Sequence, residues 1–151
     1  MRISIGLGRG PDPERAAAEA ARQANKAFPR PDLTVAFGSI ALDQRGVHRG
    51  LSGELDMARV LGGSSYAEIT GAGVTSGSVA VLNLSLGGSP SRFAQAVVSR
   101  RPAETGRRLA AGLMSAGRPG RRPLGLYFGA VATGQDNDAL GALRAGLGPV
   151  P

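Results

Sequence analysis

The first half of the chain alternates between short apolar runs and amphipathic stretches. Ile3–Leu7 is an apolar run that predicts a strand, and Leu33–Ser39 predicts a second one. Between them, Asp12–Phe28 carries alanines at helical spacing on one face, which predicts a helix that packs closely against a sheet. A stripe of aliphatic residues then predicts a helix from about Gly46 to Leu61, weakened by two internal glycines.

The second half begins with two strand patterns, Tyr66–Thr70 and Ser78–Leu86. The link between them, Gly71–Gly77, is too short for a crossover helix, so we expect these two strands to pair as an antiparallel hairpin. Beyond them the pattern predicts helices over Ser91–Arg101 and Ala103–Ala116, a strand over Leu124–Ala130, and a short last helix capped by Asp136 or Asp138.

Alternation of strands and helices predicts an α/β fold. We expect a mixed central sheet of about five strands, with one antiparallel hairpin and helices on both faces. The 151 residues suit a single domain. The chain closes on "GLGPVP", where a helix followed by Gly-Pro-Val-Pro usually leads into another strand, so we expect residues 1–151 to be the first part of a longer protein.

The glycines of "ISIGLGRGPDPE", residues 3–14, raise the question of a phosphate-binding loop. Their spacing is G-x-G-x-G rather than the dinucleotide fingerprint G-x-G-x-x-G. Asp12 and Pro13 follow as a predicted N-cap and first helical residue, and a carboxylate at that place fills the anion site of the helix. We therefore interpret the glycines as serving a turn and close packing.

The chain is strongly basic. The net charge is +7, and Lys26 is the one lysine among the 18 Lys and Arg residues. Much of the excess lies in Ser91–Pro123, which carries eight arginines against Glu104. Such a face attracts nucleic acid, but single-strand binders usually add stacking aromatics and this segment has only Phe93. A solvated arginine face is the favoured interpretation, and nucleic-acid binding stays the alternative.

Composition narrows the class of protein further. No apolar run approaches the ~20 residues of a membrane helix, and the N-terminus lacks the apolar region of a signal peptide. We therefore expect a cytoplasmic protein without a membrane partner. The chain has no Cys, which excludes disulfides, thiolate catalysis and cysteine-ligated metal sites.

Several segments, taken in order, resemble the N-terminal domain of the FIST family of bacterial sensory proteins. The resemblance rests on "DPERAAAEAARQA" at 12–24, "PDLTVAFGS" at 31–39, "GGSSYAEITGAGVTSGSVAVLNL" at 62–84 and "PLGLYFGAVATGQDNDALGALRAGLG" at 123–148. Ala67 stands where the family usually has a glycine. The family also continues into a Gly-Gly strand and a C-terminal FIST domain.

The resemblance implies an intracellular sensory module for signal transduction, with residues 1–151 as one N-terminal FIST-like domain. Small ligands such as amino acids are proposed for the family, and some members bind haem. A signalling protein or a C-terminal FIST domain is the implied partner. We expect no cofactor in this chain.

Glu68 is the first candidate for ligand binding. By strand alternation it shares one face with Tyr66 and Thr70, beside the Gly-Ser-Ser turn that contains Ser64 and Ser65. A carboxylate there accepts a ligand ammonium or holds the amides of the loop. The alternative is a glutamate on an exposed strand face.

Strand ends supply the other candidates, because ligands of open α/β sheets favour the carboxyl ends of parallel strands. Ser39 ends the second predicted strand, and Asp136, with Thr133 and Gln135, follows the last one. The predicted ligand-binding set is therefore Ser39, Ser64, Ser65, Glu68 and Asp136. Turn formation and helix capping are the alternative roles of the serines and of Asp136.

The sequence contains no recognisable catalytic constellation. His48 is the one histidine, so no two-histidine metal site exists, and an exposed structural role is favoured over haem ligation. No G-x-S-x-G motif occurs. We expect no metal site and no enzyme activity, and the leading hypothesis is a small-metabolite sensor. A basic nucleic-acid-binding module and a protein-interaction module are the rival hypotheses.

Overall fold

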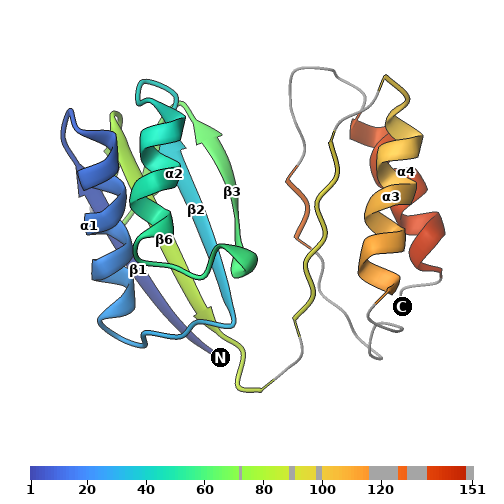
Figure 1. Ribbon diagram of the computed structural model, residues 1–151, viewed down its shortest axis with the longest axis horizontal. Coiled ribbons are helices and arrows are strands. Elements are labelled where there is room, and N and C mark those ends of the chain that lie inside the picture. The colour runs from blue at the N-terminus through green and yellow to red at the C-terminus, as the bar shows by residue number, and fades with distance from the viewer. Residues whose placement is uncertain (72, 89–90, 98–99, 116–125, 129–135, 149–151) are drawn as a thin grey trace. The chain divides into compact units, whose positions relative to one another are not determined.

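The structure is a computed structural model that describes residues 1–71, 73–88, 91–97, 100–115, 126–128 and 136–148. The chain divides into two compact units, residues 1–91 and 92–151 (Figure 1). The first unit contains β1 (Arg2–Arg9), α1 (Pro13–Asn25), β2 (Leu33–Ser39), α2 (Gln44–Ser52), η1 (Met57–Arg59), β3 (Val60–Ser65), β4 (Glu68–Thr70), β5 (Gly73–Thr75) and β6 (Ser78–Ser85). The second contains α3 (Pro102–Met114) and α4 (Asp136–Leu147).

A four-stranded mixed sheet in the order β1-β6-β2-β3 organises the first unit. β6 runs antiparallel to both of its neighbours, whereas β2 and β3 are parallel, with Val35 paired with Leu61 and also opposite Leu82. The α/β class and the mixed sheet are confirmed. The strand count differs slightly from the prediction, because the described strands form this sheet and a separate two-stranded one, β4-β5.

Both helices of the first unit cover the same face of the sheet (Figure 1). The core between them consists of small residues, with five fully buried alanines of α1 packed on Val79 and Val81 of β6. The opposite face carries Ile3 and Ile5, which are more than half exposed. The prediction of helices on both faces is therefore wrong for α1 and α2: their apolar stripes face each other and the same side of the sheet.

The glycines of β1 allow α1 to approach the sheet backbone. A Cβ on Gly6 would lie 1.9 Å from the carbonyl oxygen of Ala20, and one on Gly8 would lie 1.8 Å from that of Ala16. Asp12 caps α1, because its carboxylate accepts hydrogen bonds from the backbone N–H groups of Glu14 and Arg15. The close-packing interpretation of the glycine loop is confirmed.

The helix predicted for 46–61 is too long. α2 ends at Ser52, a single turn of η1 follows after its cap Asp56, and β3 then begins at Val60. Gly53 is the C-cap residue of α2, in right-handed helical geometry, and the low helix propensity of glycine favours an end to the helix there. Gly62, at φ +157, lies where an added Cβ would be 1.7 Å from the carbonyl oxygen of Ala36, so β3 approaches the backbone of β2 closely. That contact gives β3 its place beside β2.

The predicted pairing of the strand at Tyr66–Thr70 with the strand at Ser78–Leu86 is wrong. β4 pairs with β5 inside the segment that was expected to be only a link, with Ile69 opposite Val74. Gly73 adopts φ +103, a conformation that favours glycine and permits this tight turn. β6 inserts between β1 and β2 instead, where Val79 and Val81 become fully buried.

In the second unit, α3 and α4 pack against each other. A Cβ on Gly106 would lie 2.0 Å from the carbonyl oxygen of Ala139, so the two backbones approach closely. The predicted helix over Ser91–Arg101 is wrong, since residues 91–97 form no regular element. Arg101 precedes Pro102, whose ring disfavours helical geometry at the preceding residue. Of the predicted strand Leu124–Ala130, residues 126–128 form no strand and the others lie outside the described residues.

Candidate functional site

The carboxylate of Glu68 is buried and held by two hydroxyl groups. The Ser65 hydroxyl donates to Oε1 at 2.6 Å, and the Ser78 hydroxyl donates to Oε2. Ser78 also shares a hydrogen bond of 2.8 Å with the hydroxyl of Thr75. Glu68 is 3% exposed and Ser78 is fully buried. This network fastens the β4-β5 hairpin to the end of the main sheet.

Two other predicted residues lie at the same end. Ser39 and Ser65 are register partners at the carboxyl ends of the parallel strands β2 and β3. Ser39 is fully buried, and its Oγ accepts a hydrogen bond from the backbone N–H of Ala41. Ser64 is exposed. The structure thus brings Ser39, Ser65 and Glu68 to one end of the sheet. The strand-end rule predicted this place for Ser39, whereas Ser65 ends β3, a strand that was not predicted.

The contacts of this cluster are internal to the protein. Glu68 holds hydroxyl groups rather than loop amides, and it lies on an inward face rather than an exposed one. Neither of the two hollows described below is lined by Ser39, Ser65 or Glu68. Asp136 begins α4, but its side chain lies outside the described residues, as do Thr133 and Gln135. Ligand binding by these residues stays a prediction.

A second polar network lies at the opposite end of the sheet, inside the first unit. The Thr34 hydroxyl donates to Oδ1 of Asn83 at 2.8 Å, and Nδ2 of Asn83 donates to Oδ1 of Asn25 at 2.9 Å. Nδ2 of Asn25 in turn donates to the backbone carbonyl of Glu54 at 3.0 Å. The chain of amides therefore connects β2, β6 and α1 to the segment that leaves α2.

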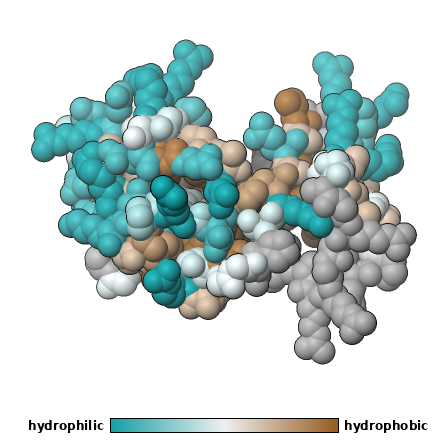
Figure 2. All heavy atoms as spheres, turned by 60° about the horizontal axis from the view of Figure 1, so that its bottom comes forward, coloured by the Kyte–Doolittle hydropathy of each residue, from teal (hydrophilic) through white to brown (hydrophobic). Residues whose placement is uncertain are grey.

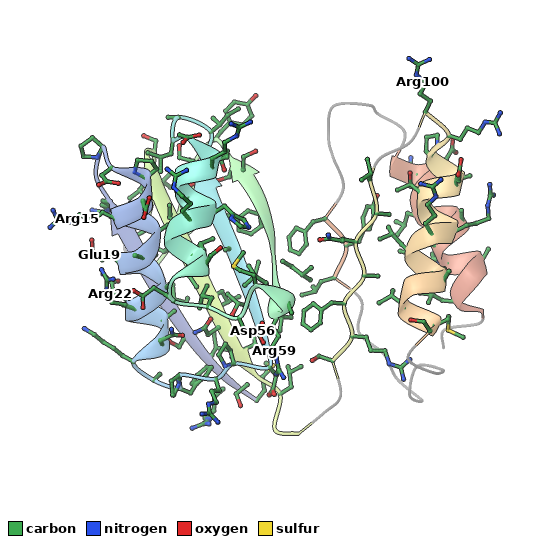
Figure 3. The ribbon with its side chains drawn as sticks, viewed as in Figure 1. Arg15, Glu19, Arg22, Asp56, Arg59 and Arg100 are labelled. Atoms are coloured by element: carbon green, nitrogen blue, oxygen red, sulfur yellow. The ribbon has the colours of Figure 1, made fainter. Side chains whose placement is uncertain are left out.

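A hollow of about 440 Å³ opens beside this network. Its wall comes from the α1–β2 connection, which contributes Arg30 and Asp32, and from the segment between α2 and β3, which contributes Glu54, Asp56 and Arg59; Pro29, Pro31, Thr34 and Leu55 complete the lining. Figure 3 shows Asp56 and Arg59 on the latter segment, away from Arg15 on the outer side of α1. Its volume falls within the range of about 300–1,000 Å³ typical of small-molecule sites.

Charges of both signs meet at this hollow, and the structure orders several of them. Glu54 accepts from Nη1 of Arg22 at 2.7 Å, and Arg59 lies 3.4 Å from Asp56. Oδ2 of Asp32 accepts a 2.6 Å hydrogen bond from the backbone N–H of Leu86. Among the described residues, Arg30 forms no ion pair. The hollow therefore offers one uncommitted guanidinium beside three carboxylates.

Sequence reasoning missed this hollow for an identifiable reason. It lies at the amino end of β2, whereas the strand-end rule directs attention to the carboxyl ends. The local signal was the dense alternation of charge and proline in "FPRPDLT", residues 28–34, together with "GELDMAR", residues 53–59. Neither segment carries a recognised ligand-binding motif, and only the fold brings them together.

A smaller hollow, of about 230 Å³, lies between α2 and the strands β2 and β3. His48 lines it together with Met57 and the backbone of Gly62 and Gly63. His48 is exposed, and its Nδ1 lies 3.3 Å from the hydroxyl of Ser52. Its volume is below the range given above for small-molecule sites, so it is the weaker candidate. No group of three potential metal-binding side chains occurs in the described part of the chain.

The arginine-rich segment is described only in part. Arg107 and Arg108 are exposed on α3, and Arg108 pairs with Glu104. Arg118, Arg121 and Arg122 lie outside the described residues. Figure 2 shows hydrophilic side chains over much of the visible face of the first unit. Exposed arginines such as Arg15 and Arg45 also occur within residues 1–91, so positive charge is not confined to one segment. Within the described residues no helix is long and apolar enough to cross a membrane.

Comparisons with known proteins place the chain in a family. The model of the FIST N domain matches residues 32–151, which is most of the chain. No curated protein matches it. Among solved structures it is similar to a point mutant of FtsZ from M. jannaschii, with 21% sequence identity and a TM-score of 0.32. That match covers 53% of this chain and 26% of the FtsZ chain, and nothing is inferred from so low a TM-score. On the family match, the chain belongs to the FIST N domain family, which is associated with sensing in signal transduction.

Proposed function

We propose that this chain senses a small metabolite with both a carboxylate and an ammonium group, such as an amino acid, for a signalling protein. The observation that carries the proposal is the hollow of about 440 Å³, whose lining includes both arginines and carboxylates: Arg30, Arg59, Asp32, Glu54 and Asp56. Membership of the FIST N domain family supports the sensory role.

The roles of the lining residues follow from their contacts. Arg30 is the free guanidinium, so it binds the ligand carboxylate through its paired N–H donors. Asp56 is exposed, with Oδ2 at 3.4 Å from Arg59 and Oδ1 accepting from the backbone N–H of Ala58, and we assign it as the acceptor of the ligand ammonium. Glu54 is already held by Arg22 at 2.7 Å and forms the fixed wall.

Hydrogen bonds hold in place the two segments that line this hollow, the α1–β2 connection and the segment between α2 and β3. Asn25 of α1 donates to the carbonyl of Glu54, and Asp32 accepts from the backbone N–H of Leu86 after β6. The Thr34–Asn83 pair beneath the hollow is fully hydrogen-bonded and buried. Such preorganised polar groups reduce the entropy lost when a ligand is ordered.

The test is a thermal-shift and calorimetric screen of the protein with the proteinogenic amino acids. Each amino acid that binds is compared with its analogue lacking the amine and its analogue lacking the carboxylate. Saturation at a hundred times Kd is expected to stabilise the fold by about 2.7 kcal/mol, and both analogues are expected to bind at least about tenfold more weakly.

Variants localise the site. Arg30→Gln and Asp56→Asn are expected to weaken binding at least about tenfold, since each removes a charge-assisted hydrogen bond to the ligand. Arg15→Gln is the matched control, because Arg15 lies on the outer side of α1 (Figure 3). No stabilisation by any amino acid at millimolar concentration, or equal binding by the Arg30 and Arg15 variants, overturns the proposal.

A further inference from the structure

Asp32 is a carboxylate that the fold holds at the rim of the larger hollow and leaves partly unoccupied. Its backbone N–H donates to the carbonyl of Leu84 at 2.9 Å, and its own carbonyl accepts from the hydroxyl of Ser91 at 3.3 Å. Oδ2 accepts from the backbone N–H of Leu86 at 2.6 Å. Oδ1 has no hydrogen-bond partner among the residues that the structure describes. The side chain is therefore fixed through one oxygen and offers the other.

The other two carboxylates of the hollow have arginine partners. Glu54 accepts from Arg22 at 2.7 Å, and Asp56 lies 3.4 Å from Arg59. Within the described part of the chain Asp32 forms no ion pair, although it is partly buried. A ligand group that displaces water from such a carboxylate loses free energy unless it donates a hydrogen bond, and a charged donor gives the strongest one. Asp32 therefore favours a cationic group.

We propose that the ligand of this hollow is a basic amino acid, whose side-chain cation binds Oδ1 of Asp32. This inference rests on the proposed function, which assigns the ligand carboxylate to Arg30 and its α-ammonium to Asp56. A ligand with one ammonium group leaves one of the two aspartates without a cation. Lysine, ornithine and arginine each bring two cationic groups and one carboxylate, which matches the three assigned residues.

The rest of the lining suits the stem of a basic side chain. Pro29, Pro31 and Leu55 supply apolar surface, and long basic side chains bury their methylene groups along such surface while the charged end reaches a polar partner. Residues 1–91 carry nine Lys and Arg residues and eight Asp and Glu residues, so the charges of the first unit nearly balance. No strong positive field of that unit therefore opposes a cationic ligand.

The first test compares two amino acids by isothermal titration calorimetry with the whole chain. L-Norleucine keeps the four side-chain carbons of L-lysine and lacks the terminal ammonium. L-Lysine is expected to bind at least about tenfold more tightly than L-norleucine. Cadaverine, which is lysine without its carboxylate, is expected to bind at least about tenfold more weakly than L-lysine, because Arg30 loses its partner.

The variant Asp32→Asn localises the effect. It removes the charge and keeps a carbonyl oxygen that accepts from the backbone N–H of Leu86. It is expected to weaken L-lysine binding at least about tenfold and to leave L-norleucine binding within about twofold. Glu19→Gln is the matched control, because it also removes one negative charge but lies on the outer side of α1 (Figure 3), and it is expected to change neither affinity.

The outcomes separate this inference from the proposed function. Equal affinity for L-norleucine and L-lysine overturns the inference and leaves the proposed function standing. Equal weakening of both ligands by Asp32→Asn assigns Asp32 to the α-ammonium and also overturns it, as does cadaverine binding as tightly as L-lysine. Failure of every amino acid to bind overturns both proposals. If Asp32→Asn does not fold by circular dichroism, the comparison of the three ligands on the unaltered protein decides.

Discussion

The carbonyl oxygen of Ala20 lies 1.9 Å from the point that a Cβ on Gly6 would occupy. The backbone of α1 therefore packs so closely on the backbone of β1 that only glycine fits at this position of the strand. A similar contact, 1.8 Å to Ala16, occurs at Gly8. These two positions explain the glycine pattern of the N-terminal segment through packing, with no phosphate involved.

Gly6→Ala is expected to destabilise the first unit by about 3 kcal/mol or more, because backbone must move to admit the methyl group. Urea unfolding followed by circular dichroism measures the change. Gly63→Ala is the control: no atom lies within 4 Å of its added Cβ, so its effect should stay within about 0.5 kcal/mol. Equal losses in the two variants would contradict the packing argument.

Glu68→Ala is expected to lower the free energy of unfolding by about 2–3 kcal/mol, because the buried hydroxyl of Ser78 and the part-buried hydroxyl of Ser65 lose their acceptor. Glu68→Gln keeps one carbonyl acceptor and should lose less. Ile69→Ala, one residue along and 82% exposed, serves as the comparison and should change stability little. A Glu68→Ala variant as stable as wild type would show that the network contributes nothing to the fold.

Thr34→Val is expected to cost about 1–3 kcal/mol, because it leaves Oδ1 of the buried Asn83 without its donor. The double variant Thr34→Val/Asn83→Leu removes both partners. The two costs should therefore be less than additive by 0.5 kcal/mol or more, roughly the coupling seen for residues in contact. A double-mutant cycle in urea measures this coupling, and strict additivity would argue against the hydrogen bond.

Gly106→Ala is expected to disrupt the packing of α3 on α4, since the added Cβ would lie 2.0 Å from the carbonyl oxygen of Ala139. Gly141→Ala is the matched helical control, because nothing lies within 4 Å of its Cβ. Because alanine has a higher helix propensity than glycine, the stability of that control variant should be unchanged or increased by up to about 1 kcal/mol. Hydrogen exchange of residues 102–114 and 136–147 reads out the pair, and faster exchange in both variants alike would count against close packing.

Periodicity located most helices and strands correctly. Asp12 and Pro13 start α1 where their side chains predicted, because N-cap chemistry is local. β2 spans Leu33–Ser39 as predicted, since its apolar run is bounded by proline and glycine signals. The predicted alternation placed Glu68 on one face with Tyr66 and Thr70, but Tyr66 lies outside β4 and is 85% exposed whereas Glu68 is 3% exposed. The inward direction of that carboxylate was therefore decided by the tertiary structure.

The sequence did not reveal which strands pair with each other. The segment Gly71–Gly77 was too short for a crossover, which correctly excluded a helix but did not reveal β5 within it. β6 chose β1 and β2 as partners because Val79 and Val81 become fully buried beneath α1 there, an energetic gain that no local pattern records. The apolar stripe of residues 46–61 likewise has helical spacing, yet its last two residues, Val60 and Leu61, belong to β3, which pairs with β2.

The sequence by itself determined the α/β class, the Asp12 cap of α1, the close backbone approach at the glycines of β1 and the resemblance to the FIST family. Each of these depends on side-chain chemistry within a few residues or on an ordered set of motifs. Only the tertiary structure decided that α1 and α2 share one face, that β6 lies between β1 and β2, and that Arg30 and Asp56 line one hollow. These are long-range outcomes, fixed by which arrangement buries the most apolar surface while satisfying every buried polar group.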